Sequence, residues 1–138
     1  MARLLGLDPG AVRCGVAITD SARTMAFPRP VLASDANLIA ALRELIEEEG
    51  VVQVVVGRPV ALSGRETAST SYSDALVAQL RAAVDNVTVV PWDERLTTQQ
   101  AQRSLGDAGV RARQHRDHVD SAAAVIMLEN FLDGHRAP

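Results

Sequence analysis

The chain has 138 residues, of which 47% are hydrophobic and 22% are charged, and its formal net charge is −3. This length and apolar content suffice for one core, so we expect a single domain over residues 1–138. The net charge excludes a protein that is basic as a whole, so any nucleic-acid site must be a local patch. All 14 residues counted as Lys or Arg are arginine, whose guanidinium can make bidentate contacts with phosphate.

The N-terminus carries no sign of a secretory signal, because Arg3 is followed by only a short apolar run that ends at Asp8. No apolar stretch approaches the roughly 20 residues that a membrane-spanning helix needs. We therefore expect a soluble, cytoplasmic protein. The single cysteine, Cys14, excludes an intramolecular disulfide and is expected to pack within a strand. An intermolecular disulfide is the alternative if that strand lies at an edge.

The first part of the chain predicts strands over residues 3–8, 13–20 and 25–32, joined by short turns. Pro9 and Gly10 break the first of them and permit a tight turn with close backbone approach. Prolines at positions 28 and 30 favour a sheet edge for the third strand, because proline cannot donate a ladder hydrogen bond. Strands joined by short turns are expected to pair antiparallel.

The remainder alternates helix and strand. A helix over residues 36–49, capped by Ser34 or Asp35, is expected to end at Gly50. The later elements are a buried strand over 51–56, a loop over 60–66, a helix over 67–84, a strand over 87–92, a helix from Thr97 or Thr98 to about 108, a basic connector over 110–116 and a final helix over 117–132. This order predicts an α/β fold whose mixed five-stranded sheet has three antiparallel strands followed by parallel crossovers. Functional groups are expected at the strand ends, where loops cluster.

Acidic residues stand at the ends of three predicted core elements. Asp8 ends the first strand, Glu94 follows the strand over 87–92 with Asp93 beside it, and Asp120 falls on the apolar face of the final helix. Buried carboxylates are rarely tolerated without a partner. A shared Mg²⁺ or Mn²⁺ would satisfy them, and such ions can activate water for phosphodiester hydrolysis.

Each carboxylate also has a structural explanation. Asp8 begins an Asp-Pro-Gly turn sequence, Asp93 and Glu94 could favour a helix N-terminus, and Asp120 could pair with an arginine. If the strand is regular, Asp93 and Glu94 point to opposite faces, so only one of them should reach Asp8. The sequence does not choose between them. Helical spacing groups Asp120 with Ala124, Met127 and Phe131.

Arginines gather near these acidic positions and are expected to contact phosphates. They are Arg13, Arg58 and Arg95 near strand ends, and Arg111, Arg113 and Arg116 in the connector before Asp120. A solvated loop is the alternative explanation for the connector.

Four segments together resemble the YqgF/RuvX family: residues 7–17, 55–64, 93–98 and 119–129, which cover nearly the whole chain in the family's order. The resemblance implies a ribonuclease H-like fold related to Holliday junction resolvases. It also implies a cytoplasmic function in ribosome biogenesis, because members are described as candidate nucleases that process the 5′ end of pre-16S ribosomal RNA.

The family pattern carries its catalytic, metal-binding site onto Asp8, Glu94 and Asp120, with Asp93 as an auxiliary residue. Asp117 departs from the pattern of many relatives and, with Asp120, resembles the paired acids of junction resolvases. His118 stands where a lysine is usual, which puts a fixed cation there in doubt.

The leading hypothesis is a metal-dependent endonuclease that acts on structured RNA. One alternative is a Holliday junction resolvase that cuts branched DNA as a homodimer, since two strands require two sites. Another is a non-catalytic ribosome-assembly or nucleic-acid-binding module, which would show salt-dependent binding without metal-dependent turnover.

Overall fold

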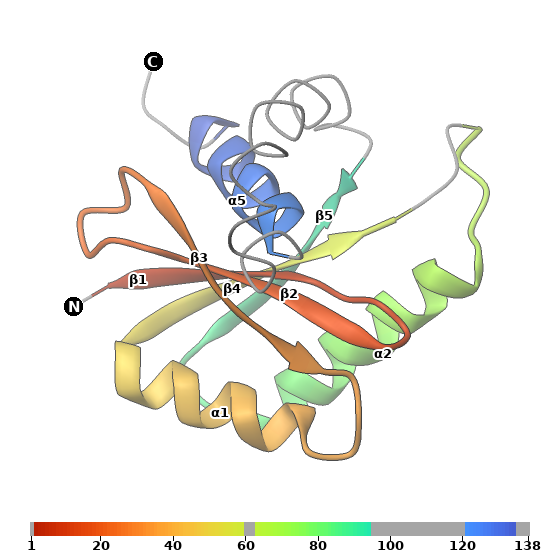
Figure 1. Cartoon of the computed structure of the whole chain (residues 1–138), viewed down its shortest axis with the longest axis horizontal. Coiled ribbons are helices and arrows are strands. Elements are labelled where there is room, and N and C mark those ends of the chain that lie inside the picture. Colours follow the sequence, from red (N-terminus) through yellow and green to blue (C-terminus); the bar gives the residue numbers. More distant parts are fainter. Residues whose placement is uncertain (1, 60–62, 95–120, 135–138) are drawn as a thin grey trace.

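The computed structural model describes residues 2–59, 63–94 and 121–134. Its elements are β1 (Arg3–Asp8), β2 (Arg13–Thr19), β3 (Ala26–Ala33), α1 (Leu38–Glu49), β4 (Val51–Arg58), α2 (Ala68–Ala83), β5 (Thr88–Asp93) and α5 (Ala122–Gly134). The strands form a 5-stranded sheet in the order β3-β2-β1-β4-β5, shown in Figure 1. This confirms the predicted α/β class, and the proline-containing β3 lies at an edge as expected.

The pairing directions also follow the prediction. β1 pairs antiparallel with β2, and β2 pairs antiparallel with β3, whereas β4 runs parallel to both β1 and β5. Helices α1 and α2 cover one face of the sheet, and α5 crosses the other (Figure 1). The carboxyl ends of β1, β4 and β5 therefore lie at the same end of the sheet.

Alternation along the strands divides the buried residues into a core on each face. In β1, Leu5 and Leu7 pack on the α1 and α2 side, whereas Leu4 packs with α5 residues. A Cβ added to Gly6 would lie 3.0 Å from Leu128 Cβ, so Gly6 also faces α5. Because side chains alternate with a period of two, Asp8 leaves the sheet on the same face as Leu4 and Gly6.

Helix boundaries differ from the sequence prediction at several ends, most of all at the starts of α1 and α5. The N-cap of α1 is Asn37 rather than Ser34 or Asp35, and Asp35 Oδ1 instead accepts a hydrogen bond from the Asn37 backbone N–H. At the other end Gly50 adopts φ 65° and ψ 42°, which confirms the predicted stop. Helix α5 begins at Ala122, because Ser121 forms a turn, so the prediction of a helix running through from residue 117 was wrong at Ser121.

The predicted helix to about residue 108 and the basic connector lie outside the described residues. Within the described ranges, no helix has the length and apolar content needed to cross a bilayer.

Cys14 lies inside the sheet and is 0% exposed. Burial first, and then the charge of Asp8, raise the pKa of its thiol to about 12. The prediction that Cys14 packs within a strand is thus confirmed, and its burial leaves no surface for a disulfide with another chain.

Candidate functional site

Asp8 is the last residue of β1, half-buried and opposite Gly15 of β2. The chain then turns through Pro9 and Gly10 toward β2. A Cβ added to Gly10 would lie 2.8 Å from the Arg13 carbonyl oxygen, closer than real Cβ atoms approach backbone oxygen. The close backbone approach predicted for this turn is therefore confirmed. The turn holds the Asp8 carboxylate at the end of the sheet.

Glu94 directly follows β5, and its carboxyl group lies over Gly57, a buried residue of the neighbouring strand β4. A Cβ added to Gly57 would collide with Glu94 Oε1 and would lie 2.9 Å from Met127 Sδ of α5. Glycine at this position therefore leaves the space that the Glu94 carboxyl group fills, between the sheet and α5. This contact explains physically why a glycine stands at position 57 of the 55–64 segment.

The side chains of Asp8 and Glu94 are hydrogen-bonded to each other. Burial raises the pKa of Glu94 to about 8, and the hydrogen bond with Asp8 and the charges of Asp8 and Asp93 act in the same direction. Burial and the neighbouring acidic groups thus disfavour the charged form of Glu94. The structure thus brings Glu94 into contact with Asp8, while Asp93 acts on Glu94 through its charge.

The remaining predicted site residues are not described by the structure. They are Asp117, Asp120, Arg95, Arg111, Arg113 and Arg116. Within residues 2–59, 63–94 and 121–134, no group of three or more His, Cys, Asp or Glu side chains is arranged to hold a metal ion. The described part of the chain supplies the Asp8–Glu94 pair, and a third carboxylate would have to come from elsewhere.

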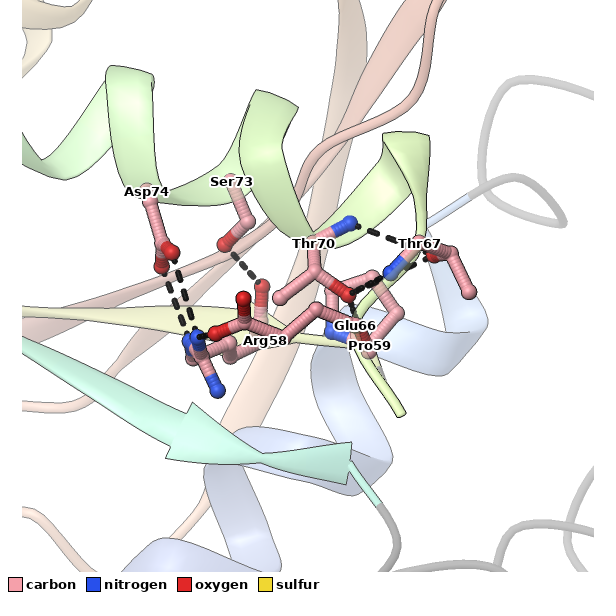
Figure 2. A network of polar contacts seen from close by, with 8 residues as sticks. Arg58, Pro59, Glu66, Thr67, Thr70, Ser73 and Asp74 are labelled. Carbon is pink, nitrogen blue, oxygen red and sulfur yellow. Dashed lines mark hydrogen bonds and ion pairs between the residues drawn. The ribbon is translucent and has the colours of Figure 1, made fainter. Parts of the chain in front are cut away.

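Arg58 lies one residue beyond Gly57, and its guanidinium contacts two carboxylates. Nε donates to Asp74 Oδ1 at 2.8 Å, and Nη2 donates to Glu66 Oε1 at 2.6 Å (Figure 2). The hydrogen bonds and charge of Arg58 lower the pKa of Asp74 below its usual value. The phosphate contact of Arg58 remains a prediction. In the structure its guanidinium is bonded to the carboxylates of Asp74 and Glu66. Arg13, the first residue of β2, is exposed beside the turn that follows Asp8.

Hydroxyl groups of α2 fix the end of β4, a role that the sequence analysis missed. Ser73 Oγ donates to the Gly57 carbonyl at 2.6 Å, and Thr70 Oγ1 donates to the Pro59 carbonyl (Figure 2). Thr67 caps α2 in a capping box with Thr70. The Thr67-x-x-Thr70 spacing could have indicated the helix start, because it resembles the usual S/T-x-x-E pattern. These bonds hold Gly57 in place beneath Glu94.

Among solved structures, the chain resembles RuvC from T. thermophilus in complex with a Holliday junction substrate. The TM-score is 0.62 at 17% identity, with 100% of this chain and 99% of the other covered. The fowlpox virus Holliday junction resolvase gives a TM-score of 0.60 at 9% identity, covering 96% and 98%. At these identities the likeness shows the fold, and it confirms the expected ribonuclease H-like architecture of the resolvases.

Sequence relatives are closer. A protein of Leifsonia xyli subsp. xyli, named as a candidate pre-16S rRNA nuclease, is 41% identical over 139 residues, which cover 96% of this chain and 86% of the relative. A protein of the same name from Mycolicibacterium paratuberculosis is 42% identical, covering 98% and 82%. The family model RuvX, described as Holliday junction resolvase, matches residues 2–134. The chain belongs to the RuvX family.

Proposed function

We propose that this protein is a divalent-metal-dependent endonuclease that cleaves structured RNA at the 5′ end of pre-16S rRNA. The observation that carries the proposal is the contact between Asp8, which ends β1, and Glu94, which follows β5; these two strands are not neighbours in the sheet. The names of relatives with about 40% identity over most of the chain support the nuclease class and the substrate. The cytoplasmic location expected from the sequence belongs to the same proposal.

The residues present fit a hard divalent cation. Asp8 and Glu94 offer carboxylate oxygens, which are the ligands that Mg²⁺ and Mn²⁺ prefer. Their contact concentrates negative charge in a half-buried place, and a cation would neutralise it. Asp120 is the proposed third ligand and Asp93 an auxiliary charge. When bound, the metal supplies an activated water and charge neutralisation at the scissile phosphate.

The protein's own contribution is to hold the ligands and the substrate in fixed positions. β1 ends at Asp8 in a tight turn, and Gly57 provides the space in which the Glu94 carboxyl group lies. Arg13, exposed beside the Asp8 turn, would contact a phosphate of the RNA backbone. The connector arginines at positions 111, 113 and 116, with Arg95, would extend that surface.

Cleavage of an RNA fragment that spans the 5′ end of pre-16S rRNA, in Mn²⁺ or Mg²⁺, tests the proposal. Asp8→Asn and Glu94→Gln should each lower the cleavage rate by about a thousandfold, because metal catalysis is worth several kcal/mol and each 1.36 kcal/mol is about tenfold in rate. Asp93→Asn is the matched control and should change the rate by less than about tenfold. Asp120→Asn tests the third ligand in the same assay. Cleavage by Asp8→Asn at the parental rate would refute the proposal.

A second candidate is a resolvase of four-way DNA junctions, favoured by the description of the matching family model. Resolution requires two cuts on two strands, so this function predicts a homodimer with paired sites. The Asp117-x-x-Asp120 pair adds to this alternative. A comparison of junction DNA with the RNA fragment as substrates, together with the molecular mass in solution, separates the two functions. Salt-dependent binding of RNA with no turnover in either metal would instead indicate a non-catalytic assembly module.

A further inference from the structure

Ser121, the residue immediately before α5, places its side-chain hydroxyl between two strands of the sheet. Its Oγ accepts a hydrogen bond from the Val16 backbone N–H at 3.0 Å and donates one to the Arg29 carbonyl at 2.7 Å. Val16 of β2 and Arg29 of β3 stand opposite each other in the ladder. The hydroxyl therefore bridges a donor and an acceptor that belong to paired strands.

The bridge stands at an irregularity of the sheet. The pairing of β2 with β3 shifts register between Cys14 and Val16, so the ladder at this point departs from regular spacing. A bulge of this kind leaves backbone groups that need another partner, and a buried unsatisfied group is costly. Ser121 is itself 0% exposed, so water does not compete for these groups. The hydroxyl completes the sheet where the strands alone do not.

The same residue also bonds to the first turn of α5. The Ser121 carbonyl accepts the first helical hydrogen bond, from the Val125 backbone N–H at 3.0 Å. Ser121 thus ties the helix start to the sheet through its side chain and to the helix through its backbone. Further along α5, Met127 Sδ lies beside the position of Gly57 that Glu94 covers. The alignment of α5 on the sheet consequently bears on the acidic site.

The bridge is also close to that site along the sheet. Val16 pairs with Leu7, and the next pair toward the turn is Asp8 with Gly15. The bridge at Val16 is therefore one residue pair away from Asp8 in the ladder.

We propose that Ser121 is a positioning residue for the metal site: its hydroxyl, bonded to both β2 and β3, sets the alignment of α5, whose Met127 lies beside Glu94 over Gly57. This inference rests on the proposed function, in which Asp8, Glu94 and Asp120 hold a divalent cation. Ser121 touches neither substrate nor metal in this assignment. It acts through the position of its neighbours.

Thr19 provides a matched control for the loss of a buried hydroxyl. Thr19 is 1% exposed, and its Oγ1 accepts a hydrogen bond from the Leu4 backbone N–H at 2.9 Å, so it too completes a backbone group of the sheet. It stands at the opposite end of β2 from the residues that face Asp8. Ser121→Ala and Thr19→Val should therefore cause comparable losses of thermal stability, measured as Tm.

The variants should differ in metal binding. Calorimetric titration of each with Mn²⁺, and the rise in Tm that Mn²⁺ causes, measure affinity without any need for turnover. Ser121→Ala should weaken Mn²⁺ binding by about tenfold or more, as changes behind metal ligands typically do. It should also lower kcat on RNA by about tenfold to a hundredfold with little change in KM. Thr19→Val should keep the parental Mn²⁺ affinity and kcat.

Hydrogen exchange adds a direct readout of the bridge, since the Val16 amide should exchange faster in Ser121→Ala than in the parent. If Ser121→Ala does not fold, Ser121→Cys replaces it, because a thiol is a weaker donor and acceptor of similar size. Parental Mn²⁺ affinity in the folded Ser121 variant, or an equal loss in Thr19→Val, would overturn the inference. Absence of cleavage by the parent protein would instead count against the proposed function. The Mn²⁺ titrations would still show whether Ser121 affects metal binding.

Discussion

Acidic side chains gather on both faces of the sheet where β4 ends. On the α2 face, Asp74 and Glu66 flank Arg58, and hydrogen bonds from the guanidinium lower the pKa of Asp74. On the α5 face, the side chain of Glu94 is hydrogen-bonded to that of Asp8, and burial raises the pKa of Glu94 to about 8. Two consecutive residues of β4 thus contact carboxyl groups in opposite states. Arg58 favours the ionised form of Asp74, whereas the carboxyl group over Gly57, that of Glu94, is disfavoured in its ionised form.

The difference teaches which cluster is structural. An arginine that belongs to the fold stabilises the ionised form of Asp74, so that cluster is complete without a ligand. The Asp8–Glu94 contact instead disfavours the ionised form of Glu94, which supports the catalytic role proposed for this pair. A divalent cation would reverse that penalty. The following variants test this difference between the Arg58 cluster and the Asp8–Glu94 pair.

Among the variants that test this contrast, the largest effect is expected from Gly57→Ala. The new Cβ would occupy the place of Glu94 Oε1 and crowd Met127 Sδ, so the carboxyl group must leave its position beside Asp8. Displacement of a metal ligand by about 1 Å can cost about a hundredfold in rate. RNA cleavage in Mn²⁺ should therefore fall by about a hundredfold.

Gly134→Ala is the matched control for that variant. Its added Cβ would lie 3.6 Å from Trp92 Cη2, an ordinary contact, at the last residue of α5. Cleavage should stay at the parental rate. If Gly57→Ala is as active as Gly134→Ala, the space over Gly57 has no part in catalysis and the contrast between the two faces loses its functional meaning.

The next effect concerns pH in metal-free protein. The pKa of Glu94 is raised from 4.5 to about 8, so its contribution to stability is fully present below about 4.5 and is lost as the pH rises through about 8. Asp74 has the opposite sign, because its lowered pKa contributes stability above 3.8 that is lost as the pH falls through the folded-state value.

Thermal unfolding in a chelator, from about pH 5 to about pH 9, measures the Glu94 contribution. Tm should decline over this range in the parent and decline less in Glu94→Gln, whose amide stays neutral. Asp74→Asn should keep the parental decline. Equal slopes in the parent and Glu94→Gln would show that the Glu94 carboxyl group ionises as an ordinary one.

A smaller effect is expected from Arg58→Ala. Loss of the pairs with Asp74 and Glu66 should lower Tm only slightly, because exposed ion pairs contribute little. The plot of log affinity for RNA against log salt should keep its slope, since the guanidinium is occupied by carboxylates. Arg13→Ala should flatten the slope by about 0.7, as loss of one phosphate contact does for single strands. The same flattening in Arg58→Ala would show that Arg58 exchanges its carboxylates for phosphate.

The smallest effect concerns Cys14, whose thiol lies within the sheet near the Asp8 charge. With 0% exposure and a pKa of about 12, it should not react with a disulfide reagent near neutral pH in the folded protein. It should react at once in denaturant. Rapid reaction of the native protein would mean that the β1–β2 end of the sheet opens readily, and that its acidic pair is less constrained than the structure indicates.

Local patterns predicted much of this fold. Short turns with proline and glycine predicted that the first three strands pair antiparallel, and helix-length segments between later strands predicted parallel crossovers. Alternation placed Asp8 on the face of Leu4, and the apolar spacing of Ala124, Met127 and Phe131 marked the buried face of α5. Each of these features depends on residues a few positions apart, so the order of residues is sufficient.

The sequence alone determined the fold class, the order of the strands along the chain and the acidic positions to be mutated. Tertiary structure alone decided that Glu94 contacts Asp8, that Gly57 makes room for it, and that Arg58 is held by carboxylates of α2 and its preceding loop. It also decided that the Ser121 hydroxyl joins β2 to β3, across 105 positions from Val16. These contacts arise where strands and helices distant in sequence pack together, and no periodicity within a segment encodes which side chain arrives from another.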